Sequence, residues 1–241
     1  MGAGKQIVAV DRSDHQLPDL PQISFRDDPE RLLALKPDLV LVRPMISRAY
    51  PQLVSRLTRS GVHVVSLQPA SVDELFRYWQ TLGRLSGHEK EAQDMIARFG
   101  RGLQDIKQQV ETIPLKKRQR VYFESIHKRM KTFAPGSIAI FVLESAGGIN
   151  VAADATQVRK TNIAAYGKEH ILAKAGVIDV FLAQKGRMNP VTVAMIKAEP
   201  GFQVIKAVKN NRIYLVDEKL VSRPTMGLLQ GISQVFNLLY P

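Results

Sequence analysis

The chain has 241 residues, a length that fits one large domain or two smaller ones with enough apolar residues to bury a core. Its composition, 45% apolar and 23% charged, is typical of a globular protein, and the absence of cysteine excludes disulfides and thiolate metal sites. No apolar run approaches the roughly 18 residues of a membrane-spanning helix, and the first residues do not form a secretion signal.

The net charge of +12 is concentrated in the second half of the chain. Residues 114–241 carry 19 Lys and Arg against 8 Asp and Glu, whereas residues 1–70 carry 9 against 7. This surplus predicts an anionic partner, which could be a negatively charged ligand, a membrane surface or nucleic acid. We expect no nucleic-acid partner, because aromatic–basic interleaving, helix-turn-helix spacing and zinc-finger spacing are all missing.

Strands alternate with short helices in the first 70 residues. Strands are predicted at residues 7–10, 39–42 and 62–67, and helices at residues 29–35 and 51–59. This alternation indicates right-handed βαβ units around a parallel sheet. The continuous apolar run at residues 39–42 is typical of a strand covered on both faces, and we expect residues 43–48 to form a loop after it.

Residues 72–113 are predicted to be helical, and residues 89–110 form one uninterrupted helix. Its apolar stripe has helical spacing and consists of Ala92, Met95, Ile96, Phe99, Leu103, Ile106 and Val110. At 1.5 Å per residue this helix spans roughly 33 Å. The spacing fits two alternatives equally well: a strut that joins two lobes, and a crossover helix in one large α/β domain.

The second half repeats the alternation of the first. Strands are predicted at residues 121–124, 177–183 and 213–216, and helices at residues 138–146, 169–175 and 226–239. The turn at residues 133–137 is predicted to cap the following helix, which Gly147 and Gly148 end. A helix, a break and a buried strand at residues 30–41 resemble the same succession at residues 169–182, which favours two similar lobes.

Several segments, in the same order along the whole chain, resemble one family: the substrate-binding proteins of ABC importers for iron–siderophores, haem, cobalamin and related metal ligands, which have a helical backbone. The matching segments are residues 2–11, 35–40, 61–65, 82–87, 146–152, 207–210 with 213–214, and 239–241. None of them is decisive alone, and the common order carries the resemblance.

The resemblance implies an α/β fold of two lobes, each with a parallel sheet flanked by helices, and a ligand cleft between them. It implies an N-terminal lobe at residues 1–70, linking helices at 71–113 and a C-terminal lobe at 114–241. It further implies a periplasmic or membrane-anchored monomer that has no intrinsic cofactor and delivers its ligand to an ABC permease. The expected ligand is a ferric siderophore, with haem, cobalamin or an oxyanion such as molybdate as alternatives. Gly-x-Ser-x-Gly and His-Glu-x-x-His motifs are absent, so we expect no enzyme.

In α/β lobes, ligands bind beyond the carboxyl ends of strands. The side chains expected there are Arg43, Met45, Arg48, Glu124, His127, Lys128, Arg129, Lys185, Arg187, Asn189 and Arg223. Because the arginine fork binds carboxylate or phosphate with two hydrogen bonds, we hypothesise a basic site for an anionic metal complex. The alternative is that most of these side chains are solvated surface charges.

His127 is a possible direct ligand of iron or haem, although the histidines at 15, 63, 88, 127 and 170 show no metal-ligand spacing. Tyr166 and Tyr50 are candidates for a phenolate or an aromatic wall. A loop methionine such as Met45 could touch a haem or serve only in packing.

The chain departs from the family pattern in two places. The first strand and helix of lobe one and the export signal are expected to be missing, which suggests a truncated chain, a short relative or a cytosolic relative without a transport role. Family members commonly dock on permease arginines through one acidic residue on each lobe. Glu169 fits the lobe-two position, whereas the lobe-one position near Tyr50 and Pro51 has no carboxylate.

Overall fold

The computed structural model covers residues 1–241 and describes all of them except residues 13, 15, 70 and 160. His15 of the sequence analysis therefore lies outside the described residues. The chain divides into two compact units. Unit 1 consists of Met1–Pro69 and Arg77–Asp94, and unit 2 consists of Ala70–Phe76 and Met95–Pro241.

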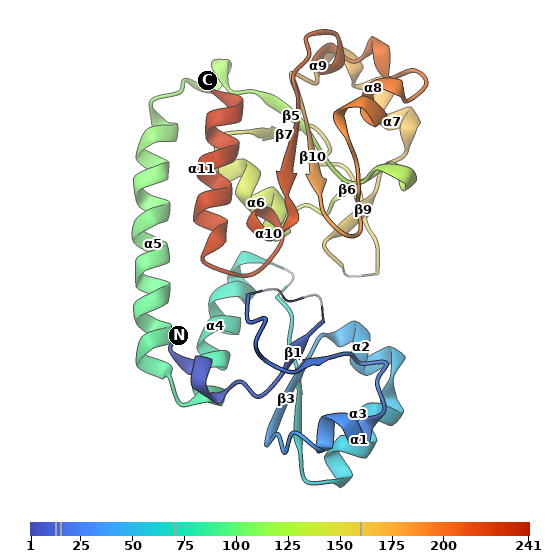
Figure 1. Cartoon of the computed structure of the whole chain (residues 1–241). Helices are drawn as coiled ribbons and strands as arrows, with labels where there is room; N and C mark the ends of the chain where they lie inside the picture. Colours follow the sequence, from blue (N-terminus) through green and yellow to red (C-terminus); the bar gives the residue numbers. More distant parts are fainter. Residues whose placement is uncertain (13, 15, 70, 160) are drawn as a thin grey trace. The chain divides into compact units, whose positions relative to one another are not determined.

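Unit 1 contains short helices and two pairs of parallel strands (Figure 1). Its elements are η1 Ala3–Gln6, β1 Val10–Asp11, β2 Gln22–Ile23, α1 Pro29–Leu33, β3 Leu39–Val42, α2 Pro44–Ala49, α3 Pro51–Arg59 and β4 His63–Ser66. Strand β1 pairs with β2, and β3 pairs with β4. The Asp28 side chain accepts a hydrogen bond from the Glu30 amide and so caps α1.

Three expectations for unit 1 are wrong in detail. The strand predicted at residues 7–10 begins only at Val10; residues 7–9 follow η1 without regular structure, and Ile7 and Val8 are exposed. The strand at residues 39–42 is not covered on both faces, since Leu41 is 49% exposed. Residues 43–48 do not form a loop: residues 44–48 lie in helix α2, which begins at Pro44 with a preset φ angle, and Arg43 is its N-cap.

Helices α4, Val72–Ser86, and α5, Glu89–Glu111, each contribute residues to both units. The long helix predicted at residues 89–110 is confirmed as α5, with one more residue at its end. Within unit 1 the two helices approach closely at Gly83, where an added Cβ would lie 2.6 Å from the Ala92 Cβ. A side chain at this position would overlap the neighbouring helix.

Unit 2 is built around one mixed sheet in the order β11-β10-β5-β6-β9-β8, with β7 paired to β5 (Figure 1). The strands are β5 Arg120–Ile126, β6 Lys131–Phe133, β7 Ile149–Asn150, β8 Thr156–Gln157, β9 Ile163–Ala165, β10 Val180–Lys185 and β11 Ile213–Asp217. Strands β5, β7, β10 and β11 are parallel, whereas β6, β9 and β8 are antiparallel to their neighbours. The predicted α/β fold is confirmed, and the expected parallel sheet is extended on one side by antiparallel strands.

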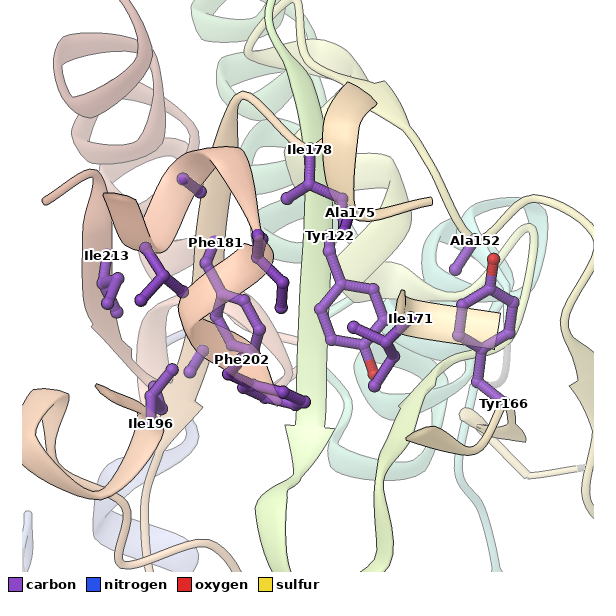
Figure 2. Close-up of a cluster of buried hydrophobic side chains, with 14 of the residues drawn as sticks. Tyr122, Ala152, Tyr166, Ile171, Ala175, Ile178, Phe181, Ile196, Phe202 and Ile213 are labelled. Atoms are coloured by element: carbon purple, nitrogen blue, oxygen red, sulfur yellow. The ribbon is translucent and has the colours of Figure 1, made fainter. Parts of the chain in front are cut away.

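Helices cover both faces of this sheet. The helices and helical turns of unit 2 are η2 Leu115–Lys117, η3 His127–Arg129, α6 Ile138–Ser145, α7 Lys168–Ala173, η4 Ala175–Val177, α8 Val193–Ala198, η5 Phe202–Val204, α9 Lys206–Lys209, α10 Glu218–Val221 and α11 Gly227–Leu239. Helices α6 and α11 pack together on one side (Figure 1). On the other side, Tyr122, Phe181 and Phe202 form the centre of an apolar core (Figure 2). Coverage of both faces explains why five consecutive residues of β5 are buried.

Candidate functional site

The carboxyl ends of the parallel strands of unit 2 gather most of the predicted ligand residues. Strands β5, β10 and β11 run in the same direction and end at Ile126, Lys185 and Asp217. The turns that follow are therefore neighbours on one edge of the sheet, which we call the carboxyl edge. Arg187 and Lys128 are exposed on these turns, so their charges are available to a bound anion.

The Asn189 side chain ties two of these turns together. Its Oδ1 accepts a hydrogen bond from the His127 amide at 2.9 Å, and its Nδ2 donates to the Gln184 carbonyl at 2.7 Å. The backbones of Gly186 and Asn189 also bond to each other in both directions, which closes a tight turn. Because Asn189 is only 2% exposed, the turn is anchored from inside and holds Arg187 on the surface.

Arg223 approaches the same edge after α10. Its Nη2 lies 3.5 Å from Oε1 of Glu218, and its side chain is 39% exposed. The Glu218 carboxylate in turn packs over Gly186, where a Cβ would overlap it. The guanidinium is therefore oriented by one weak ion pair and keeps donors for a ligand.

Glu124 and His127 form a buried pair at the end of β5. The His127 Nδ1 lies 2.9 Å from Oε2 of Glu124, and the two residues are 5% and 0% exposed. The hydrogen bond to Glu124 raises the pKa of His127, while burial raises the pKa of the Glu124 carboxyl. Both shifts favour keeping a proton in the pair near neutral pH.

His127 also faces a second, more exposed carboxylate, that of Glu199. The His127 Nε2 faces Oε2 of Glu199 at 3.9 Å, and Oε1 of Glu199 accepts from the Lys168 ammonium at 2.6 Å. Both ring nitrogens of His127 thus face carboxylates of the chain itself. Within the described residues, no group of three or more His, Asp or Glu side chains is arranged to hold a metal ion.

Tyr166 lies between β9 and α7 and is held inside unit 2. Its ring stacks on Tyr122 at a centroid distance of 5.8 Å, and its hydroxyl donates to Asp154 Oδ1 at 3.3 Å (Figure 2). Lys174 lies 5.5 Å from the ring centroid and pairs with Asp154 at 2.8 Å. Burial raises the pKa of Tyr166, so the side chain is a protonated phenol that packs in the core.

The predicted ligand residues of unit 1 and the predicted docking residue of unit 2 lie on or directly before helices. Arg43 precedes α2 in unit 1, and Met45 and Arg48 lie on that helix; all three are exposed. Glu169, the predicted docking residue of unit 2, is exposed in the first turn of α7. The structure thus places Glu124 and His127 in direct contact, and Arg187, Lys128 and Arg223 on the turns of one edge.

The sequence analysis missed the partners that hold these residues. The Gln184 carbonyl accepts from Asn189, Glu199 faces His127, and Lys168 pairs with Glu199. Glu199 and Lys168 do not stand in a loop that directly follows a predicted strand, and Gln184, which does follow one, contributes only its backbone carbonyl to Asn189. Unit 1 also has a hollow of about 520 Å³ that was not predicted. Ionic and aromatic side chains surround it, chiefly Phe25, Arg26, Asp28, Glu30, Tyr50 and Arg56.

The hollow in unit 1 is lined by side chains that already satisfy one another. Arg56 pairs with Glu30 at 2.5 Å, Asp28 caps α1, and Arg26 lies over the Phe25 ring at 5.5 Å.

In the described part of the chain, no helix is both long and apolar enough to cross a bilayer.

Comparison with known proteins agrees with this architecture. The sequence pattern of the periplasmic binding protein family matches residues 7–220. The chain is 25% identical over 250 residues to an uncharacterised ABC transporter substrate-binding lipoprotein, YvrC, of Bacillus subtilis, covering 100% of this chain and 75% of that protein. It is also 25% identical to a vitamin B12-binding protein of Vibrio cholerae, covering 97% and 81% of the two chains.

A solved structure from Staphylococcus epidermidis, described as a possible iron-binding, periplasmic solute-binding protein, is similar along the whole chain. Its TM-score is 0.83 at 26% identity, and the match covers 100% of this chain and 92% of that one. Members of the matched family are solute-binding transport proteins and not enzymes. The family match, which spans most of the sequence, decides the assignment: this chain belongs to the periplasmic binding protein family.

Proposed function

We propose that this chain is the substrate-binding protein of an ABC importer that captures a metal-containing ligand, with a ferric siderophore as the first candidate. The similarity to a possible iron-binding protein and to a vitamin B12-binding protein supports a metal-containing ligand as cargo. In this proposal the protein acts outside the cytoplasm as a monomer and passes its ligand to a membrane permease.

The observation that carries the choice of an anionic ligand is the carboxyl edge of unit 2. Arg187 and Lys128 are exposed there, and Arg223 keeps donors beyond its weak pair with Glu218. A ferric siderophore that bears carboxylates presents planar anionic groups that an arginine fork binds with two hydrogen bonds. The buried Glu124–His127 pair and the Asn189 side chain serve as the support that fixes these turns.

The experiment is a thermal-shift and titration series with ferric siderophores, haemin, cobalamin and molybdate. We expect saturable stabilisation by a carboxylate-bearing ferric siderophore, following RT ln(1 + [L]/Kd). The double variant R187A/R223A should weaken this binding roughly 100- to 10,000-fold, since charged hydrogen bonds contribute about 1.5–3 kcal/mol each and about 1.4 kcal/mol is a factor of ten. The matched control R98A/R101A removes two exposed arginines from α5 and should bind as the parent does.

Two outcomes would revise the proposal. Stabilisation by cobalamin alone would favour the second candidate, which the similarity to the vitamin B12-binding protein of V. cholerae supports. Unchanged siderophore binding by R187A/R223A would remove the carboxyl edge as the ligand site. Arg43, Met45 and Arg48 of unit 1 stay predicted ligand residues, and a separate R43A/R48A variant tests them by the same titration.

We also propose Glu169 as a docking residue for the permease. The side chain is exposed in the first turn of α7, where a carboxylate can reach a partner's arginine. The substitution Glu169→Gln should lower uptake by the reconstituted transporter and leave ligand binding intact. Equal uptake by parent and variant would exclude this role.

A further inference from the structure

The edge of unit 2 opposite the carboxyl edge combines exposed cations with exposed apolar side chains. The parallel strands β5, β10 and β11 begin there, and the backbone links their first residues. The Asp179 amide donates to the Arg120 carbonyl at 2.8 Å, and the Phe181 amide donates to the Arg212 carbonyl at 3.0 Å. The turns before these strands, η2 and α9, therefore lie on one side of the unit (Figure 1).

These turns carry a group of side chains that we call the amino-edge patch. It consists of Lys116, Lys117, Arg120, Lys209, Leu115 and Ile149. Ile149 belongs to the same edge because its amide donates to the Gln119 carbonyl at 2.9 Å.

The positive charge of the amino-edge patch is largely uncompensated. Among the described residues of these turns the carboxylate is that of Asp179, and it is already bound by Lys206 at 2.7 Å. Arg212 is likewise held internally by the Gln119 side chain and the Leu239 carbonyl. Within the described part of the chain, Lys116, Lys117 and Lys209 have no carboxylate within ion-pair distance. Their charges therefore face solvent.

The apolar component distinguishes this patch from an ordinary basic surface. Leu115 is 75% exposed, the highest value among the exposed large apolar side chains described, and Lys116 and Lys117 follow it directly in the turn. Ile149 is 41% exposed on the neighbouring strand. A protruding leucine next to lysines is suited to a bilayer surface, where the side chain enters the acyl boundary while the cations contact anionic headgroups.

We propose that the amino-edge patch binds the surface of a membrane that contains anionic phospholipids. The bilayer is favoured over nucleic acid because Leu115 and Ile149 would gain from burial in lipid, whereas a phosphate backbone offers them no apolar partner. The binding would be peripheral, since it depends on one small turn and a few charges.

The test is flotation of the full chain with unilamellar vesicles, without added ligand. Vesicles that contain phosphatidylglycerol should bind the chain, and vesicles of pure phosphatidylcholine should not. Each cation at an anionic surface contributes a factor of roughly five, so K116Q/K117Q should weaken binding roughly 30-fold. L115S keeps the charge and should weaken binding by about ten-fold. The matched control R98Q/R101Q removes two exposed cations from α5 and should bind as the parent does.

The other outcomes would each overturn the proposal. Absent binding to anionic vesicles, or equal binding to neutral ones, would exclude a lipid partner. An equal loss of vesicle binding in R98Q/R101Q would mean that binding depends on the net charge of the chain and not on the amino-edge patch. Binding to a DNA duplex that L115S leaves unchanged, with no vesicle binding, would assign the patch to nucleic acid. Melting temperatures of all variants, measured on the same samples, exclude loss of folding as the cause.

Discussion

The substitution Asn189→Ala tests the proposed support of the carboxyl edge. It removes the acceptor of the His127 amide and the donor to the Gln184 carbonyl, which lie at 2.9 Å and 2.7 Å. Because Asn189 is 2% exposed, we expect both backbone groups to stay largely shielded from water. Each buried group without a partner costs about 1–3 kcal/mol, so the free energy of unfolding of unit 2 should fall by about 2–6 kcal/mol.

The assay is guanidinium unfolding followed by far-UV circular dichroism, together with hydrogen exchange of the His127 amide. Fluorescence of Trp79, which belongs to unit 1, provides an internal reference. The control Asn210→Ala changes an exposed asparagine in the same unit and should stay within about 0.5 kcal/mol of the parent. The reasoning is refuted if N189A behaves like N210A, or if unit 2 is destabilised while exchange at His127 is unchanged.

Three further predictions concern packing and charge. Because Glu124 raises the pKa of His127, the stabilisation by this pair is complete below the ordinary pKa of about 6.5 and is lost as pH rises through the raised value. The free energy of unfolding of the parent should therefore fall above about pH 6.5. If the free energy of unfolding of His127→Asn fell with pH in the same way, the explanation would be wrong. The Tyr122 hydroxyl is buried and has no hydrogen-bond partner among the described residues. The free energy of unfolding of Tyr122→Phe, measured by chemical denaturation, should therefore equal that of the parent or exceed it by up to about 1 kcal/mol. Gly83→Ala should lower the stability of unit 1 by about 1–3 kcal/mol, because the new Cβ would overlap Ala92; a more stable variant by Trp79 fluorescence would show that the helices adjust.

Long, regular elements could be predicted from the sequence. The apolar stripe at residues 92–110 predicts α5 almost to its ends, and the runs at 121–124, 177–183 and 213–216 locate β5, β10 and β11. In these segments local periodicity and burial point to the same structure. The Ser137 cap and the stop at Gly147 are confirmed for the same reason.

Short elements could not be predicted, because their stability depends on neighbours that are distant in sequence. Strands β6, β8 and β9 have two or three residues each and exist through antiparallel pairing. The exposed face of Leu41 likewise depends on what packs beside β3, which its own sequence does not record.

The candidate site could be predicted in part for the same physical reason. The rule for strand ends selected Glu124, His127 and Asn189, which the structure connects through hydrogen bonds. It could not find Glu199, which faces His127, or Lys168, which pairs with Glu199, because the loop and the helix that carry them come close to His127 only in the folded chain.

The division of α4 between the units bears on how this protein is made. Every residue of unit 1 has been synthesised once Asp94 is added, whereas residues 70–76 belong to a unit whose sheet begins at Arg120 and ends at Asp217. At roughly 5–20 residues per second, Leu75 must wait on the order of ten seconds for the rest of its unit. Leu75 is fully buried in the finished chain, so this apolar side chain is expected to be exposed during translation and to be a natural contact for a chaperone.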